Sequence, residues 1–417
     1  MVTLDFRTRK AVDDVTVDAS AFFEDRLDSL LAERGIQAGR AAGRLGLRPL
    51  TLEIDGAPWT LIPGDQGLKV RSGSDDQLVA VLDGAAFSEL VQDASSTFGL
   101  QLTGRATLRC GTTDQLVAWE PLLRWLVDGR PVYEPGVIAF VDSRGEPLDL
   151  HRSYQIDEDP AEMAHFLAQA GFLHLENVFS KDEMAAVSAE LDDAIGAASA
   201  EDGASWWART QTGEWYASRI LGFNQKSPTL RELLRRDQLT MIGRLTDDHY
   251  VQRDPEVGDS AEGLLKKVGV TEGISDVSWH KDCAMGGHSR SCCGLTVGIS
   301  VTGARRENGE LGVVAGSHRA NVAPLGIDGI DLPRVPLPTS TGDITVHCSC
   351  TLHMSRPPVS AERRVVYTGF SLAPKEGDRP VLLSPAEIRR RRAALNGQVL
   401  RGQRHGSLTS HVASIDL

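Results

Sequence analysis

The sequence lacks any run of about 20 apolar residues, the length that a membrane-spanning helix needs. Its first residues, MVTLDFRTRKAVDD, carry too many charges for a secretory signal. Positive charge is in deficit, because 44 Lys and Arg face 57 Asp and Glu and the formal net charge is −13. This balance argues against a nucleic-acid surface. We therefore expect a soluble, cytoplasmic protein whose partner is a small molecule, with no membrane insertion. The oligomeric state has no signal in the sequence.

Cysteine is scarce, and its spacing matches no zinc or redox motif. The chain has six cysteines and no C-x-x-C. The adjacent pair Cys292–Cys293 and the alternate pair Cys348–Cys350 do not fit a zinc ribbon. Because cytosolic thiols stay reduced, we predict buried, unpaired cysteines.

The first part of the chain has the pattern of a small α+β domain. Between residues 45 and 73, short apolar runs alternate with turn pairs such as Asp55-Gly56 and Gly64-Asp65, which predicts strands joined by hairpin turns. LDGAAFSELVQDA then has helical spacing, and AWEPLLRWLVDGRPVYEPG predicts a closing amphipathic helix that ends at Gly129. No residue in this part offers catalytic chemistry.

This order of elements resembles the sterol-carrier-type lipid-binding domain. The resemblance covers residues 45–135 and rests on the pattern of strands and helices rather than on an invariant motif. It implies a small sheet with helices over an apolar tunnel. A packed domain that serves dimerisation or stability would show the same pattern.

The second part begins after a polar, turn-rich stretch, VDSRGEPLDLHRSYQIDEDPAE. We predict a linker at residues 146–160, between a domain at 1–145 and a domain at 161–417. In the latter, Ser180 and Glu183 form a capping box that starts a helix. From about residue 273 to 372 four or more strand-like runs follow without a helix between them, which predicts a barrel or a sandwich.

The stretch SWHKDCAMGGHSR carries the candidate metal ligands. In a strand, His280 and Asp282 would point to the same side, so an imidazole and a carboxylate converge. The best third ligand is His353 in GDITVHCSCTLHMSRPP, with His347 as its competitor in the same segment. Two histidines and one carboxylate leave three metal positions open, as in non-haem Fe(II) oxygenases.

A guanidinium that could hold an anion follows these ligands. Arg363 and Arg364 come ten and eleven residues after His353 and begin the run RRVVYTGF. An arginine that faces the barrel there could bind a carboxylate through paired charge-assisted hydrogen bonds. Open iron positions beside such an arginine are what a 2-oxo-dicarboxylic acid needs.

The second part resembles the phytanoyl-CoA dioxygenase family of Fe(II)/2-oxoglutarate oxygenases. The matching pieces, in the family's order, are GFLHLENVFSKDEM, WHKD, NGELGVVAGSH, GDITVHCSCTLHMS and RRVVY. The resemblance implies a mainly-β double-stranded β-helix, a jelly-roll or cupin-like barrel with flanking helices. It also implies Fe(II), with 2-oxoglutarate and O2 as cosubstrates. His280, Asp282 and His353 match the iron ligands.

The same resemblance assigns the cosubstrate residues. Ser355 matches a hydroxyl that helps to bind the 2-oxoglutarate carboxylate. The cosubstrate arginine falls at Arg363 or Arg364, and the usual motif begins with the arginine, which favours Arg363. Lys266 or Lys267 matches a basic residue that precedes these motifs.

This sequence departs from the family at three places. It lacks the glycine that usually follows the distal histidine, it has Ala315 where the family usually has Pro, and it carries about 150 additional N-terminal residues. The N-terminal addition puts an acyl-CoA substrate in doubt. The acid at position 282 favours hydroxylation, because related halogenating enzymes have a small residue there.

Other residues near the motifs receive a more ordinary interpretation. We read His288 and His318 as non-ligands, and Cys283 would face away from Asp282 in a regular strand. The aromatic residues of ASWWARTQTGEWYASR would either wall an apolar pocket or pack in the core. They are Trp206, Trp207, Trp215 and Tyr216.

Together these observations predict a dioxygenase that hydroxylates or otherwise oxidises an unactivated C–H bond of a small, hydrophobic metabolite, of the kind met in natural-product biosynthesis. Two alternatives use the same residues differently. One is a zinc-dependent hydrolase with the same ligands, and the other is a non-catalytic lipid-binding or carrier protein.

Overall fold

The structure is a computed structural model that describes residues 16–102, 104–273, 276–285 and 294–372. His288, Cys292 and Cys293 lie outside the described residues. Within the described part, no helix combines the length and the apolar character that crossing a bilayer requires.

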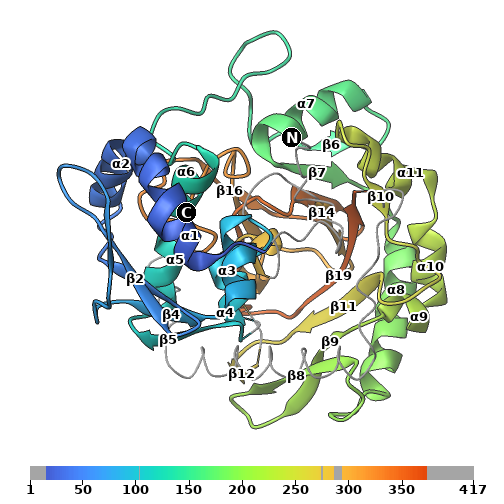
Figure 1. The fold of residues 1–417 in the computed structure, drawn as a ribbon. Helices are drawn as coiled ribbons and strands as arrows, with labels where there is room; N and C mark the ends of the chain where they lie inside the picture. Colours follow the sequence, from blue (N-terminus) through green and yellow to red (C-terminus); the bar gives the residue numbers. More distant parts are fainter. Residues whose placement is uncertain (1–15, 103, 274–275, 286–293, 373–417) are drawn as a thin grey trace.

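The N-terminal region is a five-stranded sheet covered by helices (Figure 1). The strand order is β3-β2-β1-β4-β5, in which β1 is antiparallel to β2 and parallel to β4. Apolar side chains from the sheet and the helices form one core. The elements are α1 (Ala19–Ala21), η3 (Phe22–Arg26), α2 (Leu27–Arg44), β1 (Leu50–Ile54), β2 (Ala57–Ile62), β3 (Lys69–Ser72), β4 (Val79–Leu82), α3 (Gly84–Val91), α4 (Thr97–Leu102), β5 (Ala106–Cys110), α5 (Thr113–Ala118) and α6 (Glu120–Asp128).

Local sequence signals explain the ends of these elements. Asp55 and Gly56 both have positive φ, 49° and 84°, in the turn that joins β1 to β2, a conformation that Asp-Gly adopts readily. Gly129 has φ 71° and ends α6 in the left-handed conformation. The α+β class expected for this region is therefore confirmed, whereas lipid binding stays a prediction.

The second region contains two sheets that share a core. A ten-stranded, mostly antiparallel sheet has the order β12-β8-β9-β11-β19-β14-β17-β7-β6, with β10 beside β19. A four-stranded sheet has the order β13-β18-β15-β16. Val313 of the small sheet lies in the same apolar cluster as Val297 and Val346 of the large one. In the described residues the two sheets pack together without closing into one hydrogen-bonded barrel. The expected fold class, a mainly-β jelly roll with flanking helices, is confirmed.

These are the elements of the second region: β6 (Tyr154–Gln155), α7 (Pro160–Ala170), β7 (Phe172–Glu176), α8 (Lys181–Gly196), β8 (Ser205–Thr210), β9 (Trp215–Ile220), α9 (Phe223–Lys226), α10 (Pro228–Leu234), α11 (Asp237–Thr240), η4 (Met241–Leu245), β10 (Val251–Gln252), β11 (Ala261–Lys266), β12 (Val270–Glu272), β13 (Val277–His280), η5 (Asp282–Met285), β14 (Gly294–Ser300), η6 (Arg306–Asn308), β15 (Leu311–Val314), β16 (Arg334–Leu337), β17 (Ile344–Cys348), β18 (His353–Ser355) and β19 (Arg363–Ser371).

Helices α8 to α11 lie outside the large sheet, along one edge of the molecule (Figure 1). The capping box is present, because the Ser180 hydroxyl accepts from the Glu183 backbone and the Glu183 carboxylate accepts from the Ser180 backbone. Between α6 and β6 the chain has little regular structure. The domain limits and the linker at 146–160 stay predictions.

Candidate active site

Three candidate ligands meet at the edge of the small sheet. His280 ends β13 and His353 begins β18, and these antiparallel strands place the two residues opposite each other. Their ring centroids are 4.2 Å apart. Asp282 begins the 3-10 turn η5 directly after β13. The prediction that His280 and Asp282 lie in one strand was therefore wrong. The turn, rather than strand alternation, brings its carboxylate back toward His280.

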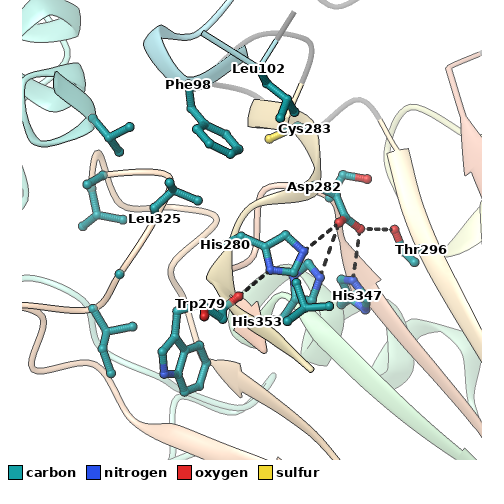
Figure 2. A pocket seen from close by; sticks show the side chains of 18 of the residues that line it. Phe98, Leu102, Trp279, His280, Asp282, Cys283, Thr296, Leu325, His347 and His353 are labelled. Carbon is teal, nitrogen blue, oxygen red and sulfur yellow. Dashed lines mark hydrogen bonds and ion pairs between the residues drawn. The ribbon is translucent and has the colours of Figure 1, made fainter. Parts of the chain in front are cut away.

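The three side chains are close enough to share one ion (Figure 2). Oδ1 of Asp282 lies 3.2 Å from Nε2 of His280 and 3.5 Å from Nε2 of His353. One ligand atom from each residue lies within 4.8 Å of the others. The structure thus brings together His280, Asp282 and His353, the candidate ligands named from the sequence.

Hydrogen bonds on the far side of both rings prepare them for a metal. Nδ1 of His280 lies 2.8 Å from the Ser278 carbonyl oxygen, and Nδ1 of His353 lies 2.9 Å from that of Thr351. A carbonyl oxygen can only accept, so Nδ1 carries the proton and the lone pair of Nε2 faces the shared point. The residues present therefore fit a metal ion held by two imidazoles and one carboxylate.

The protonation states agree with this fit. Burial, and then the neighbouring His353, lowers the pKa of His280, so the ring stays neutral. Burial alone would raise the pKa of Asp282, but the neighbouring His353, together with His280 and His347 around the same carboxylate, holds that pKa well below its ordinary range. A neutral imidazole beside an ionised carboxylate is the state that binds a divalent cation.

A second cluster, which we call the cationic end, consists of Arg363, Lys266 and Ser355. Arg363 begins β19 and faces Lys266, the last residue of β11, in the antiparallel register. Lys266 donates from Nζ to the Ser355 hydroxyl at 2.5 Å, and Nη1 of Arg363 lies 3.5 Å from the same oxygen. Arg363 and Lys266 are only 2% and 4% exposed.

The protein itself balances the positive charge of the cationic end only in part, through the more distant Asp276 carboxylate, which opposes the effect of burial on the Lys266 pKa. Burial, reinforced by the charge of Arg363, lowers the pKa of Lys266 well below its ordinary range. Nε of Arg363 has no hydrogen-bond partner. The described residues place no carboxylate within salt-bridge distance of either cation. Because buried cations require a partner, the cluster fits a carboxylate ligand.

Arg364 and Lys267, the alternative candidates for binding 2-oxoglutarate, face away from Ser355. Arg364 follows Arg363 on the opposite face of β19, where its Nη1 lies 2.8 Å from Asp192. Lys267 likewise pairs with Glu214 at 2.7 Å. Of the two arginines named from the sequence, the structure therefore brings only Arg363 to Ser355.

A third histidine contacts the cluster from the large sheet. His347, in β17, places Nε2 3.5 Å from Oδ2 of Asp282, and its ring centroid is 4.2 Å from that of His353. The Thr296 hydroxyl donates to the same Oδ2 at 2.8 Å. His347 is thus beside the candidate ligands but outside the group whose ligand atoms all lie close together. His318 lies apart, with its Nε2 3.0 Å from the Ala168 carbonyl oxygen.

One large cavity joins these groups. Its volume is about 1460 Å³, and it is lined by His280, Asp282, His353 and Ser355. Trp279, Cys283 and Leu325 of the second region, which we call the barrel region, also line it (Figure 2). Phe98 and Leu102 line it from the N-terminal region. Among the four aromatic residues named from the sequence, Trp206 lines this cavity. Trp215 is half exposed and Tyr216 packs in a small separate core.

The N-terminal part of the lining was missed in the sequence. Phe98 and Leu102 belong to a short helix without a motif, about 180 residues before the metal-ligand segment, so no spacing rule connects them to it. Cys283 also lies nearer the site than expected, because η5 is a turn. Its Sγ lies 3.2 Å from Sγ of Cys350.

Several solved structures are similar to part of the chain. AviO1 from Streptomyces viridochromogenes Tue57 is 21% identical, with 53% of this chain and 97% of that chain covered and a TM-score of 0.42. The epimerase SnoN, in complex with Fe3+, alpha ketoglutarate and nogalamycin RO, is 20% identical, with 54% and 93% covered and a TM-score of 0.42. EctD from S. alaskensis, with 2-oxoglutarate and 5-hydroxyectoine, is 18% identical, with 62% and 96% covered and a TM-score of 0.43. TM-scores this low carry no argument about what the chain binds.

The family comparison is the informative one. No curated protein matches the chain. Residues 167–366 match the family described as phytanoyl-CoA dioxygenase (PhyH), and this range contains the three candidate ligands and the cationic end. Residues 167–366 are therefore a domain of the phytanoyl-CoA dioxygenase family, and the chain is an Fe(II)/2-oxoglutarate-dependent oxygenase.

Proposed function

We propose that the chain hydroxylates, or otherwise oxidises, an unactivated C–H bond of a bulky and mainly apolar small molecule. The observation that carries this proposal is the pair of sites in one cavity. The two-histidine, one-carboxylate cluster lines the cavity, and so does Ser355, whose hydroxyl binds Lys266 of the cationic end.

In this proposal His280, Asp282 and His353 hold the ferrous ion and leave three positions open. When bound, iron and 2-oxoglutarate supply the oxidising chemistry, in which O2 is consumed and the keto acid becomes succinate and CO2. The protein contributes the ligands, the orientation and a cavity that limits water.

Arg363, Ser355 and Lys266 bind the far carboxylate of 2-oxoglutarate. Its negative charge compensates the two buried cations, and its oxygens accept from the guanidinium and the hydroxyl. Binding of a carboxylate would explain why Lys266 and Arg363 are buried side by side around Ser355.

The shape of the cavity supports a large substrate. Ordinary small-molecule pockets have volumes of about 300–1,000 Å³, and this cavity has about 1460 Å³. Phe98, Leu102, Leu325 and Trp279 give it apolar walls. Asp282 occupies the acid position with its carboxylate turned to the histidines, which favours hydroxylation over halogenation.

Two alternatives explain less of the molecule. A zinc hydrolase would use the same three ligands but would leave the buried Lys266 and Arg363 without a function. A lipid carrier would not need an ionised carboxylate close to two buried histidines.

The test is succinate formation by protein purified without oxygen and then given Fe(II), labelled 2-oxoglutarate and O2. We expect turnover with the wild type and none above the iron-only background with Asp282→Ala or His353→Ala, because either change removes a ligand. Arg144→Ala is a control for folding, because the Arg144 side chain is 80% exposed and does not line the cavity. Equal succinate formation by the Asp282→Ala variant would contradict the ligand assignment, and hydrolysis with zinc alone would favour the hydrolase.

A further inference from the structure

We propose that the N-terminal region forms the outer wall of the substrate pocket and that Phe98 and Leu102 determine which substrate fits. This inference rests on the proposed function, because it assigns the N-terminal region to the same cavity. It gives a role to the part of the chain that lies outside the family match.

The side chains of Phe98 and Leu102 face the cavity that the candidate metal ligands also line. Phe98 and Leu102 line it together with His280 and Asp282. Figure 2 shows them across Cys283 from the ligands, with Leu325 on the adjacent wall. Their helix, α4, also packs against the turn η5, which begins with Asp282. The N-terminal wall is therefore next to the chemistry rather than at a distant entrance.

A buried ionic network fixes the start of α4. The Glu120 carboxylate accepts from the Thr97 backbone N–H at 2.7 Å. Glu120 lies 3.6 Å from Arg124, which also lies 3.6 Å from Asp93 and 3.2 Å from Asp128. All four charged groups are buried, so the network holds α4 in one place. Such support is expected of a residue pair that sets the shape of a pocket.

The barrel side of the pocket is tied to the same N-terminal region. Asn321 donates from Nδ2 to the carbonyl oxygens of Pro121 and Arg130, both at 2.9 Å. The Asp331 carboxylate accepts from the Tyr133 hydroxyl and from the Gly136 N–H. The segment between these two contact points, residues 322–330, lines the cavity. The two walls therefore form one continuous surface.

The chemistry of the walls indicates the class of ligand. Phe98, Leu102 and Val117 from the N-terminal region face a cavity that Leu325 and Trp279 line from the barrel region. These five side chains are apolar, and charged residues such as Asp114 and Arg219 line the same cavity, so the cavity has both apolar and charged surface. A bulky molecule with an apolar body would contact both walls while one of its carbons reaches the metal cluster.

The test measures binding of one probe, 1-anilinonaphthalene-8-sulfonate, to the zinc-loaded protein by fluorescence. We expect Phe98→Ser, Leu102→Ser and Leu325→Ser each to raise the Kd of the probe about ten-fold, as expected for the loss of one apolar side-chain contact. Ile36→Ser is the matched control, because Ile36 is an exposed apolar residue of the same region and does not line the cavity. Its Kd should equal that of the wild type.

Two outcomes would contradict the proposal that both regions form the wall of one pocket. An unchanged Kd in both α4 variants would remove Phe98 and Leu102 from the pocket. A Kd that rises with the α4 variants but not with Leu325→Ser would place the probe inside the N-terminal region alone. Zinc replaces iron and neither 2-oxoglutarate nor O2 is present, so the result does not depend on whether the protein forms succinate.

An independent observation concerns His347, and we infer that this residue positions the Asp282 carboxylate. His347 is 1% exposed, and neither of its ring nitrogens makes a hydrogen bond. Its Nε2 nevertheless lies 3.5 Å from Oδ2 of Asp282, the oxygen that also accepts from Thr296. The Thr296 hydroxyl binds Oδ2 and the His347 ring faces the same oxygen at ion-pair distance, so Oδ1 is left for the ion between His280 and His353.

A positioning role agrees better with the proposed chemistry than a fourth ligand does. With three protein ligands, a six-coordinate ion has two positions for a keto acid and one for O2. With His347 as a fourth ligand, no position would remain for O2 once the keto acid has bound.

Metal affinity in a Co(II) titration followed by absorption tests this role. We expect His347→Phe to weaken Co(II) binding by about 10–100-fold, as for other residues that hold a metal ligand in place. Thr296→Val should change the affinity in the same direction. His347→Gln keeps a donor and should restore most of the affinity, whereas a residue needed only for packing would be replaced better by Phe.

His165→Phe is the control, because this histidine lies outside the cavity and its Nε2 lies 2.8 Å from the Val141 carbonyl oxygen. Thermal unfolding of the metal-free variants separates folding from metal binding. Unchanged Co(II) affinity in His347→Phe, or equal losses in the Phe and Gln variants, would contradict the inference.

Discussion

The two regions of the molecule bury charge in opposite ways. In the N-terminal region one buried cation, Arg124, lies among three carboxylates, those of Asp93, Glu120 and Asp128. In the barrel region two buried cations, Lys266 and Arg363, share a hydroxyl group and have no carboxylate at salt-bridge distance in the described part of the chain. In the first arrangement the protein itself supplies the opposite charge, although Nε of Arg124 and one oxygen of Glu120 make no hydrogen bond. The second would gain from an anion supplied by a ligand.

This difference separates structural charge from functional charge. A buried ion pair that satisfies itself fixes local geometry, here the start of α4. A buried cation without a partner costs stability unless a ligand supplies the opposite charge. A buried cation can therefore serve structure or ligand binding. The presence or absence of carboxylates around it indicates which of the two.

The largest expected effect is on folding, through Arg124. Arg124→Met leaves three buried carboxylates without their cation, so we expect the free energy of unfolding to fall by about 3–5 kcal/mol. Urea denaturation measures this change. Arg105→Met removes a partly exposed pair with Glu89 and should cost less than about 1 kcal/mol. Equal losses in the two variants would contradict the description of the Arg124 network.

The next effect is on cosubstrate binding, through Arg363. Arg363→Ala should raise the KM for 2-oxoglutarate about 30-fold or more, the scale of losing roughly 2–5 kcal/mol from a buried charged contact. Arg364→Ala, the adjacent change on the outer face, should leave that KM near the wild-type value. The assignment fails if the Arg364 variant loses more affinity than the Arg363 variant.

The smallest effect is on stability and has the opposite sign from that of Arg124. Lys266→Met replaces a buried cation with an apolar side chain of similar length, so the free energy of unfolding should stay constant or rise by about 1 kcal/mol. Binding of 2-oxoglutarate should weaken at the same time. Urea denaturation and calorimetric titration of the same sample measure both quantities. A loss of stability as large as that of Arg124→Met would show that the two charge clusters do not differ.

Several ends of helices and strands, and the candidate metal ligands, could be predicted from local sequence signals. Asp55-Gly56 indicated a hairpin, Ser180 with Glu183 indicated a helix start, and Gly129 indicated a helix end, because each depends on a few adjacent residues. The motifs also named His280, Asp282 and His353, which the structure brings together. Such features need no knowledge of the tertiary fold.

The rest depends on how distant segments pack. The choice between Arg363 and Arg364 required the direction in which β19 alternates, and the position of Asp282 required the turn η5. His347 was considered only as a competitor of His353, because its distance from Asp282 depends on how the two sheets pack. Phe98 carries no motif, so only the structure could place it in the cavity.

The most direct test of the account is a crystal structure with Mn(II), a redox-inert substitute for Fe(II), and 2-oxoglutarate. We predict a metal ion bonded to His280, Asp282 and His353, with the far carboxylate of the keto acid on Arg363 and Ser355. A metal ion bound elsewhere, or a keto acid whose far carboxylate lies away from Arg363, would contradict the account.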